Sequence, residues 1–140
     1  MRSASRVVIL ILLSAAAWSR PAADIASVVG SWEGDSKCAV AASACHDEHA
    51  LYRIAPDKKG PANLTVDGYK IVDGTPVFMG TLACTYHADQ STLSCSGSTS
   101  QKDDWEFQIS GDTMTGTLKI GDEKTLYRRI TLHKTHPKES

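Results

Sequence analysis

The sequence predicts an all-β fold: an eight-stranded antiparallel up-and-down barrel stapled by two disulfides. Three observations lead to this prediction. Short runs of alternating apolar and polar residues follow one another, clusters of turn-forming residues separate them, and no long stretch has helical periodicity. Successive hairpins favour an up-and-down strand order, and closure into a barrel removes the exposed edges that an open sheet would present.

The expected strands are bounded by residues that favour turns. Asp73-Gly74, Gly111-Asp112 and Gly121-Asp122 supply the backbone conformations that tight hairpin turns require. The strands are expected at residues 29–38, 46–54, 63–72, 76–87, 92–98, 104–110, 113–120 and 124–132.

Alternation along the last three expected strands assigns one face of each to the barrel interior, because side chains on a strand point alternately to opposite faces. The inward set that this predicts consists of Trp105, Phe107, Ile109, Met114, Leu118, Leu126, Arg128, Ile130 and Leu132.

The chain contains four cysteines, all of them after residue 23. An even number in a secreted chain indicates disulfides, and four cysteines allow three pairings. A turn at 88–91 would place Cys84 opposite Cys95, which leaves Cys38 to pair with Cys45 across a small loop. A four-cysteine zinc site is the alternative, but these spacings lack the close pairs typical of structural zinc sites.

Residues 1–23 have the organisation of a secretory signal peptide. The first six residues contain two arginines, Arg2 and Arg6; an apolar run then covers 7–13, and small residues follow at 14–17. The run is too short to cross a bilayer, which takes about 20 apolar residues; an uncleaved anchor is the alternative. We therefore expect a secreted or periplasmic protein with no membrane insertion after processing.

The expected mature part is a single β-barrel domain at 24–133, followed by a polar tail at 134–140. The whole chain has 15 basic and 16 acidic residues. Removal of 1–23 takes away three arginines and no acidic residue, which leaves a net charge of −4. Nucleic-acid binding depends on Lys and Arg that neutralise phosphates, so nucleic acid is not expected as a partner.

The first expected strand carries Gly30-Ser31-Trp32, a G-x-W motif, and the last carries Tyr127-Arg128-Arg129. This arrangement resembles lipocalin-like (calycin-type) proteins, and the chain is similar to small secreted β-barrel proteins of uncharacterised bacterial families. The resemblance implies that Trp32 closes one barrel end and that Arg128 or Arg129 stacks on its indole ring. Alternation favours Arg128, because it shares the inward face. The resemblance does not identify a ligand, since the last strand lacks the R-x-Y motif of fatty-acid-binding relatives.

The densest polar cluster is Cys45-His46-Asp47-Glu48-His49. His46 and His49 are the candidate metal ligands, because imidazole suits zinc and copper. On a strand, however, neighbouring members of this cluster would face opposite ways, so no metal or cofactor is expected. Glu33 and Glu48 could form an acid–base pair only if both pointed inward, and an enzyme is the function least expected.

We expect a binding protein for a small apolar or amphipathic ligand, because a small barrel is either packed solid or holds one ligand. The alternative is a protein-interaction or inhibitor module with a solid barrel, which would act through the loops at 38–45 and around Lys58-Lys59. The expected ligand-binding residues are Tyr52, Trp105, Phe107, Met114, Leu118 and Arg128.

Overall fold

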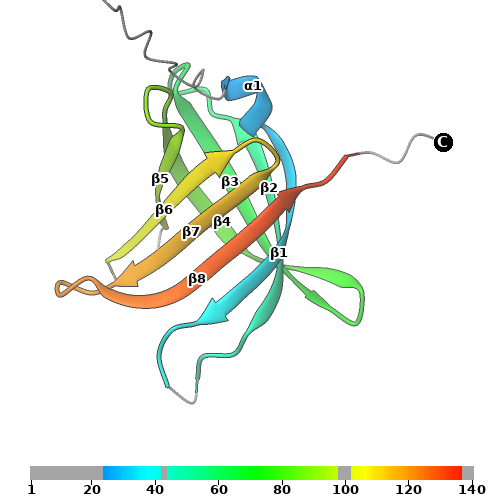
Figure 1. Cartoon of the computed structure of the whole chain (residues 1–140), viewed down its shortest axis with the longest axis vertical. Helices are drawn as coiled ribbons and strands as arrows, with labels where there is room; N and C mark the ends of the chain where they lie inside the picture. Colours follow the sequence, from blue (N-terminus) through cyan, green and yellow to red (C-terminus); the bar gives the residue numbers. More distant parts are fainter. Residues whose placement is uncertain (1–23, 42–43, 98–101, 137–140) are drawn as a thin grey trace, which may run out of the picture.

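The computed structural model describes residues 24–41, 44–97 and 102–136. The expected signal peptide at 1–23 lies outside the described residues. Figure 1 shows a short helix at one end of a single closed sheet. In chain order the elements are α1 (Ile25–Val28), β1 (Gly30–Cys38), β2 (Glu48–Pro56), β3 (Asn63–Val72), β4 (Thr75–His87), β5 (Thr92–Gly97), β6 (Asp103–Ser110), β7 (Thr113–Ile120) and β8 (Thr125–Lys134).

The sheet is a closed antiparallel barrel in which every strand pairs with the next along the chain, and β8 pairs back with β1. The predicted fold class is therefore confirmed. Local turn chemistry explains the tight connection between β3 and β4. Asp73 and Gly74 both have positive φ, 49° and 78°, which is the combination that a two-residue hairpin turn of this kind needs.

Both predicted disulfides are present, Cys38–Cys45 and Cys84–Cys95. Cys84 lies directly opposite Cys95 in the β4–β5 pair, as the hairpin prediction requires. No described cysteine is free, so the alternative of a four-cysteine zinc site is wrong. Each crosslink contributes about 2–3 kcal/mol to the free energy of unfolding if its effect is to restrict the unfolded chain.

The hydrophobic core fills the barrel from α1 toward its middle. It is built from the inward-facing residues of all eight strands together with Val28 of the helix. One contact is unusually close: the Phe107 ring lies over Gly116, where a Cβ atom would come within 2.3 Å of Phe107 Cδ1. The members of the core are Val28, Trp32, Ala50, Tyr52, Ile54, Leu64, Val66, Cys84, Tyr86, Leu93, Cys95, Phe107, Ile109, Met114, Ile130 and Leu132.

Trp32 closes the end of the barrel that carries α1. Its side chain is 0 % exposed, and its indole N–H donates to the carbonyl oxygen of Val28 at 2.9 Å. The cation over its ring is Lys134, with Nζ 5.6 Å from the ring centroid. The prediction that Arg128 or Arg129 stacks on Trp32 is therefore wrong.

Strand register explains this correction. In the β1–β8 pair Trp32 lies opposite Lys134, whereas Arg128 lies opposite Cys38, six residues further along β1. Six strand residues span about 20 Å, so Arg128 sits at the other end of the barrel. Arg129 lies opposite Lys37 and is exposed.

A register shift in the β7–β8 pair corrects the predicted inward face of β8. Leu118 lies opposite Arg128, but the next residue, Lys119, lies opposite Leu126. Neighbouring residues of β7 point to opposite faces, so Leu126 and Arg128 do not share a face as predicted. The extra residue in β8 is Tyr127, which makes this a β-bulge.

The barrel extends beyond residue 133, where the sequence predicted its end. Lys134 is the last residue of β8, and the backbone N–H of Thr135 donates to the carbonyl oxygen of Ser31 at 2.9 Å. The beginning of the predicted polar tail is therefore part of the sheet, while residues 137–140 lie outside the described residues.

Candidate ligand-binding cavity

A cavity of about 310 Å³ occupies the end of the barrel opposite α1. We call this the open-end cavity. All eight strands contribute to its lining: β2, β3, β4 and β6 with two or more residues each, and β1, β5, β7 and β8 with one each. Its lining consists of Ser36, Glu48, Ala50, Tyr52, Gly68, Tyr69, Met79, Gly80, Thr81, Leu82, Gly97, Asp103, Trp105, Leu118 and Arg128.

Four of the six predicted ligand-binding residues line this cavity: Tyr52, Trp105, Leu118 and Arg128. The other two, Phe107 and Met114, are buried in the core and do not line it. The division follows from position along the strands. Trp105 and Phe107 share the inward face of β6, but Phe107 lies two residues closer to the closed end.

The floor of the cavity is aromatic. Tyr52 and Trp105 meet edge to face, with ring centroids 6.5 Å apart, and Tyr52 also contacts Phe107 edge to face at 5.9 Å. Such pairs are favoured by the ring quadrupoles and add to the energy of burial. The floor is therefore a rigid apolar surface that joins the cavity to the core below it.

Tyr52 places a polar atom on this floor. The residue is 7 % exposed and lines the cavity. Its hydroxyl makes no hydrogen bond to another described residue, and no fully enclosed side-chain polar atom in the described part of the chain lacks a partner, so the hydroxyl opens to the cavity. Burial raises its pKa, an effect that nearby Arg128 opposes and Glu48 reinforces. The phenol therefore stays neutral and can both donate and accept a hydrogen bond.

Arg128 lies on the wall of the cavity with its side chain only 12 % exposed. Nη1 donates to the backbone carbonyl of His46 at 3.0 Å and to Ser36 Oγ at 3.3 Å. Nη2 lies 3.6 Å from Glu48 Oε1. A guanidinium at this depth requires such partners, because an unpaired buried charge costs several kcal/mol.

Asp103 supplies a second carboxylate, on the β6 side of the cavity. Oδ1 accepts a hydrogen bond from the backbone N–H of Gly97 at 2.9 Å, and Oδ2 accepts one from Trp105 Nε1 at 3.3 Å. A Cβ atom at Gly97 would come within 2.6 Å of Asp103 Oδ2. The glycine therefore leaves the space that this carboxylate occupies.

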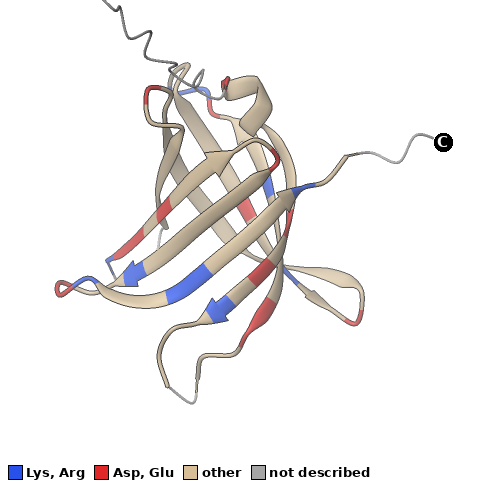
Figure 2. Cartoon of the chain, viewed as in Figure 1, with Lys and Arg blue, Asp and Glu red and all other residues tan. Residues whose placement is uncertain are grey.

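Sequence reasoning missed Asp103 and Ser36 as cavity residues and considered Glu48 only for catalysis and as part of a metal-ligand cluster. The alternation of the strands could have identified both carboxylates as inward-facing. Glu48 lies two residues before the inward Ala50, and Asp103 lies two residues before the inward Trp105, and residues two apart on a strand share a face. Figure 2 shows acidic and basic residues on neighbouring strands toward this end of the barrel.

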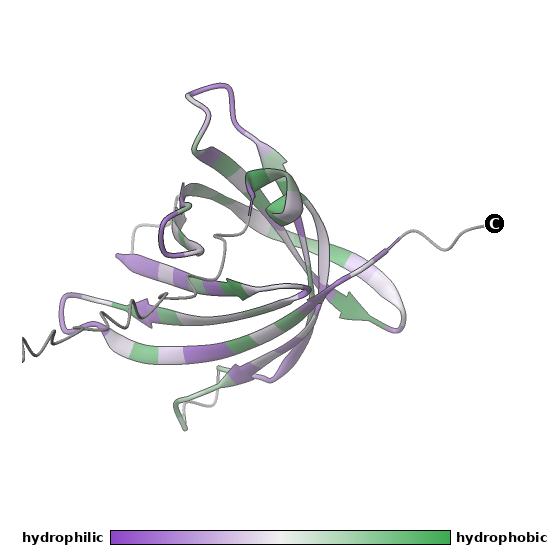
Figure 3. Ribbon diagram, turned by 45° about the horizontal axis from the view of Figure 1, so that its top comes forward, coloured by the Kyte–Doolittle hydropathy of each residue, from purple (hydrophilic) through white to green (hydrophobic). Residues whose placement is uncertain are grey.

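A hairpin beside the cavity carries exposed apolar side chains. We call residues 69–79 the projecting hairpin, and Figure 1 shows it extending away from the barrel. Phe78 and Met79 are 57 % and 56 % exposed, and Met79 and Tyr69 also line the cavity. A register shift between Gly68 and Tyr69 marks the point where the hairpin leaves the barrel wall. Figure 3 shows hydrophobic residues continuing onto it.

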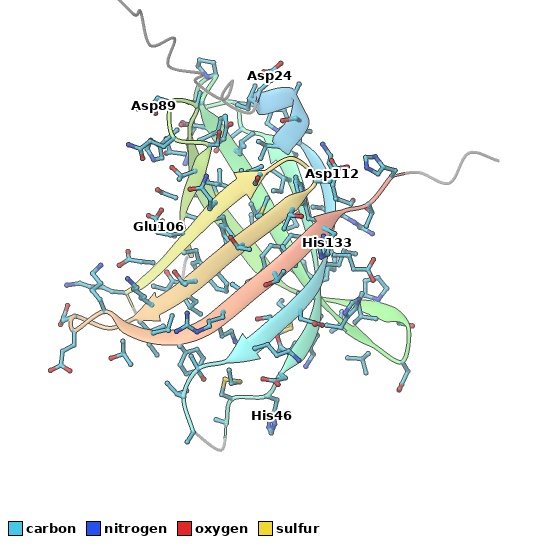
Figure 4. All side chains as sticks on the ribbon, viewed as in Figure 1. Asp24, His46, Asp89, Glu106, Asp112 and His133 are labelled. Carbon is cyan, nitrogen blue, oxygen red and sulfur yellow. A yellow bond between two sulfur atoms is a disulfide. The ribbon has the colours of Figure 1, made fainter. Side chains whose placement is uncertain are left out.

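The two histidines predicted as metal candidates do not form a metal site. His49 points to the outer surface, where Nε2 lies 2.7 Å from Glu33 Oε1 and Nδ1 lies 3.6 Å from Asp35 Oδ1. His46, labelled in Figure 4, lies in the β1–β2 loop and offers its backbone carbonyl to Arg128. Within the described ranges, no group of three or more His, Cys, Asp or Glu side chains could hold a metal ion.

The possible acid–base pair of Glu33 and Glu48 is also absent from the described structure. Glu33 bonds His49 on the outer surface, whereas Glu48 lines the cavity beside Arg128. The two carboxylates therefore lie on opposite faces of the sheet.

The two loops of the predicted interaction surface lie at opposite ends of the barrel. The loop at 38–45 follows β1 and the loop with Lys58-Lys59 follows β2, so the length of β2 separates them. Nine strand residues span about 30 Å, so the two loops do not form one surface.

A second, shallower hollow lies on the outer face of β6, β7 and β8 and is lined largely by Thr115, Thr117, Thr131, Gln108 and Arg129. Phe107 and Ile130 also reach its lining, but every polar side chain that lines it is exposed or half-buried. The open-end cavity, with the buried Ser36 and Tyr52 in its lining, is the better candidate site.

The chain matches no family model and no curated protein. The class of protein is defined by the fold and the cavity: it is a small eight-stranded barrel with one polar, partly open end. Among the described residues, no helix has the length and apolar character to cross a membrane.

Proposed function

We propose that this chain is a lipocalin-like secreted or periplasmic binding protein that holds a small apolar or amphipathic molecule, without changing it chemically, in the open-end cavity. The observation that carries the proposal is the cavity itself, which joins an aromatic floor to a polar wall. Its volume of about 310 Å³ is at the lower end of the range of ligand pockets, about 300–1,000 Å³. The ligand is accordingly small.

Two features support the proposed location. Both pairs of cysteines are joined as disulfides, and disulfides persist in oxidising compartments such as the periplasm and the extracellular space. Residues 1–23 have the charge and apolar pattern of a signal peptide.

The proposed binding mode divides the ligand between two surfaces. Its apolar body lies against Trp105, Leu118 and Tyr52, where burial gains about 25 cal/mol per Å² of apolar surface. Its polar end lies near the Tyr52 hydroxyl and the Arg128 side chain, both of which face the cavity.

Titration with n-octanol tests this function, with heat and tryptophan fluorescence as the signals. We expect saturable binding at one site. Leu118→Trp fills the cavity and should weaken binding by at least about tenfold, or 1.4 kcal/mol. Thr117→Trp adds the same ring one residue away on the outer face and serves as the matched control. If Leu118→Trp binds n-octanol as well as the unmodified protein does, the ligand does not occupy this cavity.

The alternative function, a protein-interaction or inhibitor module, requires a solid barrel. It is less favoured because the open end is hollow and because the two loops assigned to it lie at opposite ends. Failure of any small apolar molecule to bind would favour it.

A further inference from the structure

The charges that line the open-end cavity point to one class of ligand. Glu48 and Asp103 are acidic and Arg128 is the only basic residue of the lining, a formal net charge of −1. We propose that the cavity selects molecules in which a positively charged amino group is attached to a small apolar body. This inference rests on the proposed function and adds the charge of the ligand to it.

The first argument is that Arg128 is already occupied. Its guanidinium donates to Ser36 and to the His46 carbonyl and is paired with Glu48. An anionic ligand at Arg128 would compete with Glu48 for the guanidinium, and the Glu48 carboxylate would remain in the same cavity. Leaving a partly buried carboxylate without its partner is costly.

The second argument is that Asp103 has accepting capacity left. Each of its oxygens accepts one hydrogen bond, from Gly97 N–H and from Trp105 Nε1, whereas a carboxylate has about four lone-pair sites. Its two present donors are neutral, and no ion pair joins it to a described cation. An ammonium group would supply the missing positive charge.

The third argument is the aromatic floor. Trp105 and Tyr52 form this floor, whereas the ring of Tyr69, which also lines the cavity, already has the Arg53 guanidinium 4.8 Å from its centroid. Aromatic faces attract cations, with a gain of about 0.5–2 kcal/mol that grows as the site is desolvated. The Tyr52 hydroxyl, which has no partner among the described residues, can accept a hydrogen bond from an ammonium group. The same atoms offer nothing comparable to a carboxylate ligand, because only the hydroxyl could donate to it.

A matched series of ligands tests the inference on the unmodified protein. n-Octylammonium, n-octanol and n-octanoate share one apolar chain and differ in the charge of the end group. Calorimetric titration at pH 7 should rank n-octylammonium above n-octanol and n-octanoate last, with at least about tenfold between first and last.

Two variants then locate the effect. Asp103→Asn should weaken n-octylammonium binding by about tenfold and leave n-octanol nearly unchanged. Asp104→Asn is the matched control: it removes the same charge one residue along β6, where the side chain pairs with Lys124 on the outer surface. Circular dichroism would verify that both variants keep the fold.

The outcomes separate the two proposals. If n-octanoate binds most tightly, or all three bind equally, the preference for a cation is wrong while ligand binding in the cavity stands. If Asp104→Asn weakens n-octylammonium as much as Asp103→Asn does, the preference arises from overall charge rather than from the cavity. If none of the three binds, the proposed function fails, and this inference with it.

Discussion

Lys134 illustrates how one residue completes a barrel end. Its ammonium group lies over the Trp32 ring and also donates to the carbonyl oxygen of Ser27, in the helix α1. It therefore links the last strand, the first strand and the helix at the closed end. A lysine serves here where the family resemblance implied an arginine.

We predict that Lys134→Ala lowers the free energy of unfolding by about 1 kcal/mol, the size of a cation–π contact. Arg129→Ala, on the outer surface, should change it by less than about 0.5 kcal/mol. Trp32→Ala should cost about 3–5 kcal/mol, as other large-to-small core substitutions do. Urea denaturation measures all three. A larger loss for Arg129→Ala than for Lys134→Ala would contradict the assignment of the cation.

His49 should make stability depend on pH. The hydrogen bond with Glu33 raises the pKa of His49, so the charged form is favoured in the folded state. The stabilisation is complete below the unfolded pKa of about 6.5 and is lost as pH rises through the higher folded value. The group is half exposed, so we expect a contribution below about 1 kcal/mol.

The measurement compares the unmodified protein with His49→Gln by urea denaturation from pH 5.5 to 8.5. The difference in unfolding free energy between the two should shrink as pH rises. Glu33→Gln should remove most of the same pH dependence, because it takes away the main cause of the pKa shift. A difference that grows with pH would show that the sign is wrong.

At the scale of elements, the β6–β7 pair depends on a residue without a side chain. Gly116 lies opposite Phe107, and the Phe107 ring occupies the space where a Cβ atom would be. The ring thereby packs in the barrel interior, where it also contacts Tyr52 of the cavity floor edge to face.

Gly116→Ala should lower the free energy of unfolding by about 1–3 kcal/mol, the cost of overpacking a core. The added methyl group also meets the Glu106 carbonyl oxygen at 2.9 Å, so rotation of the Phe107 ring alone cannot relieve the contact. Gly60→Ala is the control: the nearest atom to its added carbon is 3.8 Å away. Thermal denaturation should show a clear loss for the first and almost none for the second.

The β3–β4 pair shows a different use of irregularity. A bulge at the level of Gly68 and Gly80 turns the projecting hairpin away from the barrel wall. Its base contributes Tyr69 and Met79 to the cavity, and Phe78, which pairs with Tyr69 at the same base, is exposed. The direction of the hairpin depends on where the neighbouring strands stop pairing.

At the scale of the whole molecule, the two ends of the barrel differ in the polarity of their inward-facing side chains. One end is dry and apolar, closed by Trp32 and α1, and the other carries Ser36, Glu48, Asp103 and Arg128 on inward faces. Inward polar residues in a small barrel are expected only where a cavity or a partner satisfies them. The polarity gradient is therefore the molecular reason to look for function at the open end.

Much of the fold could be predicted because it depends on patterns within short segments of the sequence. The eight strands, the tight turn at Asp73-Gly74 and the pairing of Cys84 with Cys95 all follow from alternation and turn chemistry within short segments. Part of the site followed too, since Tyr52, Trp105 and Leu118 are inward apolar or aromatic residues. Phe107 and Met114 lie in the core and not in the lining of the cavity, because alternation predicts the face of a residue but not its depth in the barrel.

The sequence by itself thus determined the strand order, the inward faces of the strands apart from Leu126 in β8, and both disulfides, since each depends on residues that lie close together in the chain. Only the tertiary structure decided which cation meets Trp32 and which charges meet in the cavity. Those contacts depend on the register between β1 and β8, two strands that lie far apart in the chain. Arg128 and Lys134 are six residues apart on β8, and this register places Arg128 beside Glu48 at the open end and Lys134 on Trp32 at the closed end. A shift of one residue would move these side chains to the opposite face of the strand.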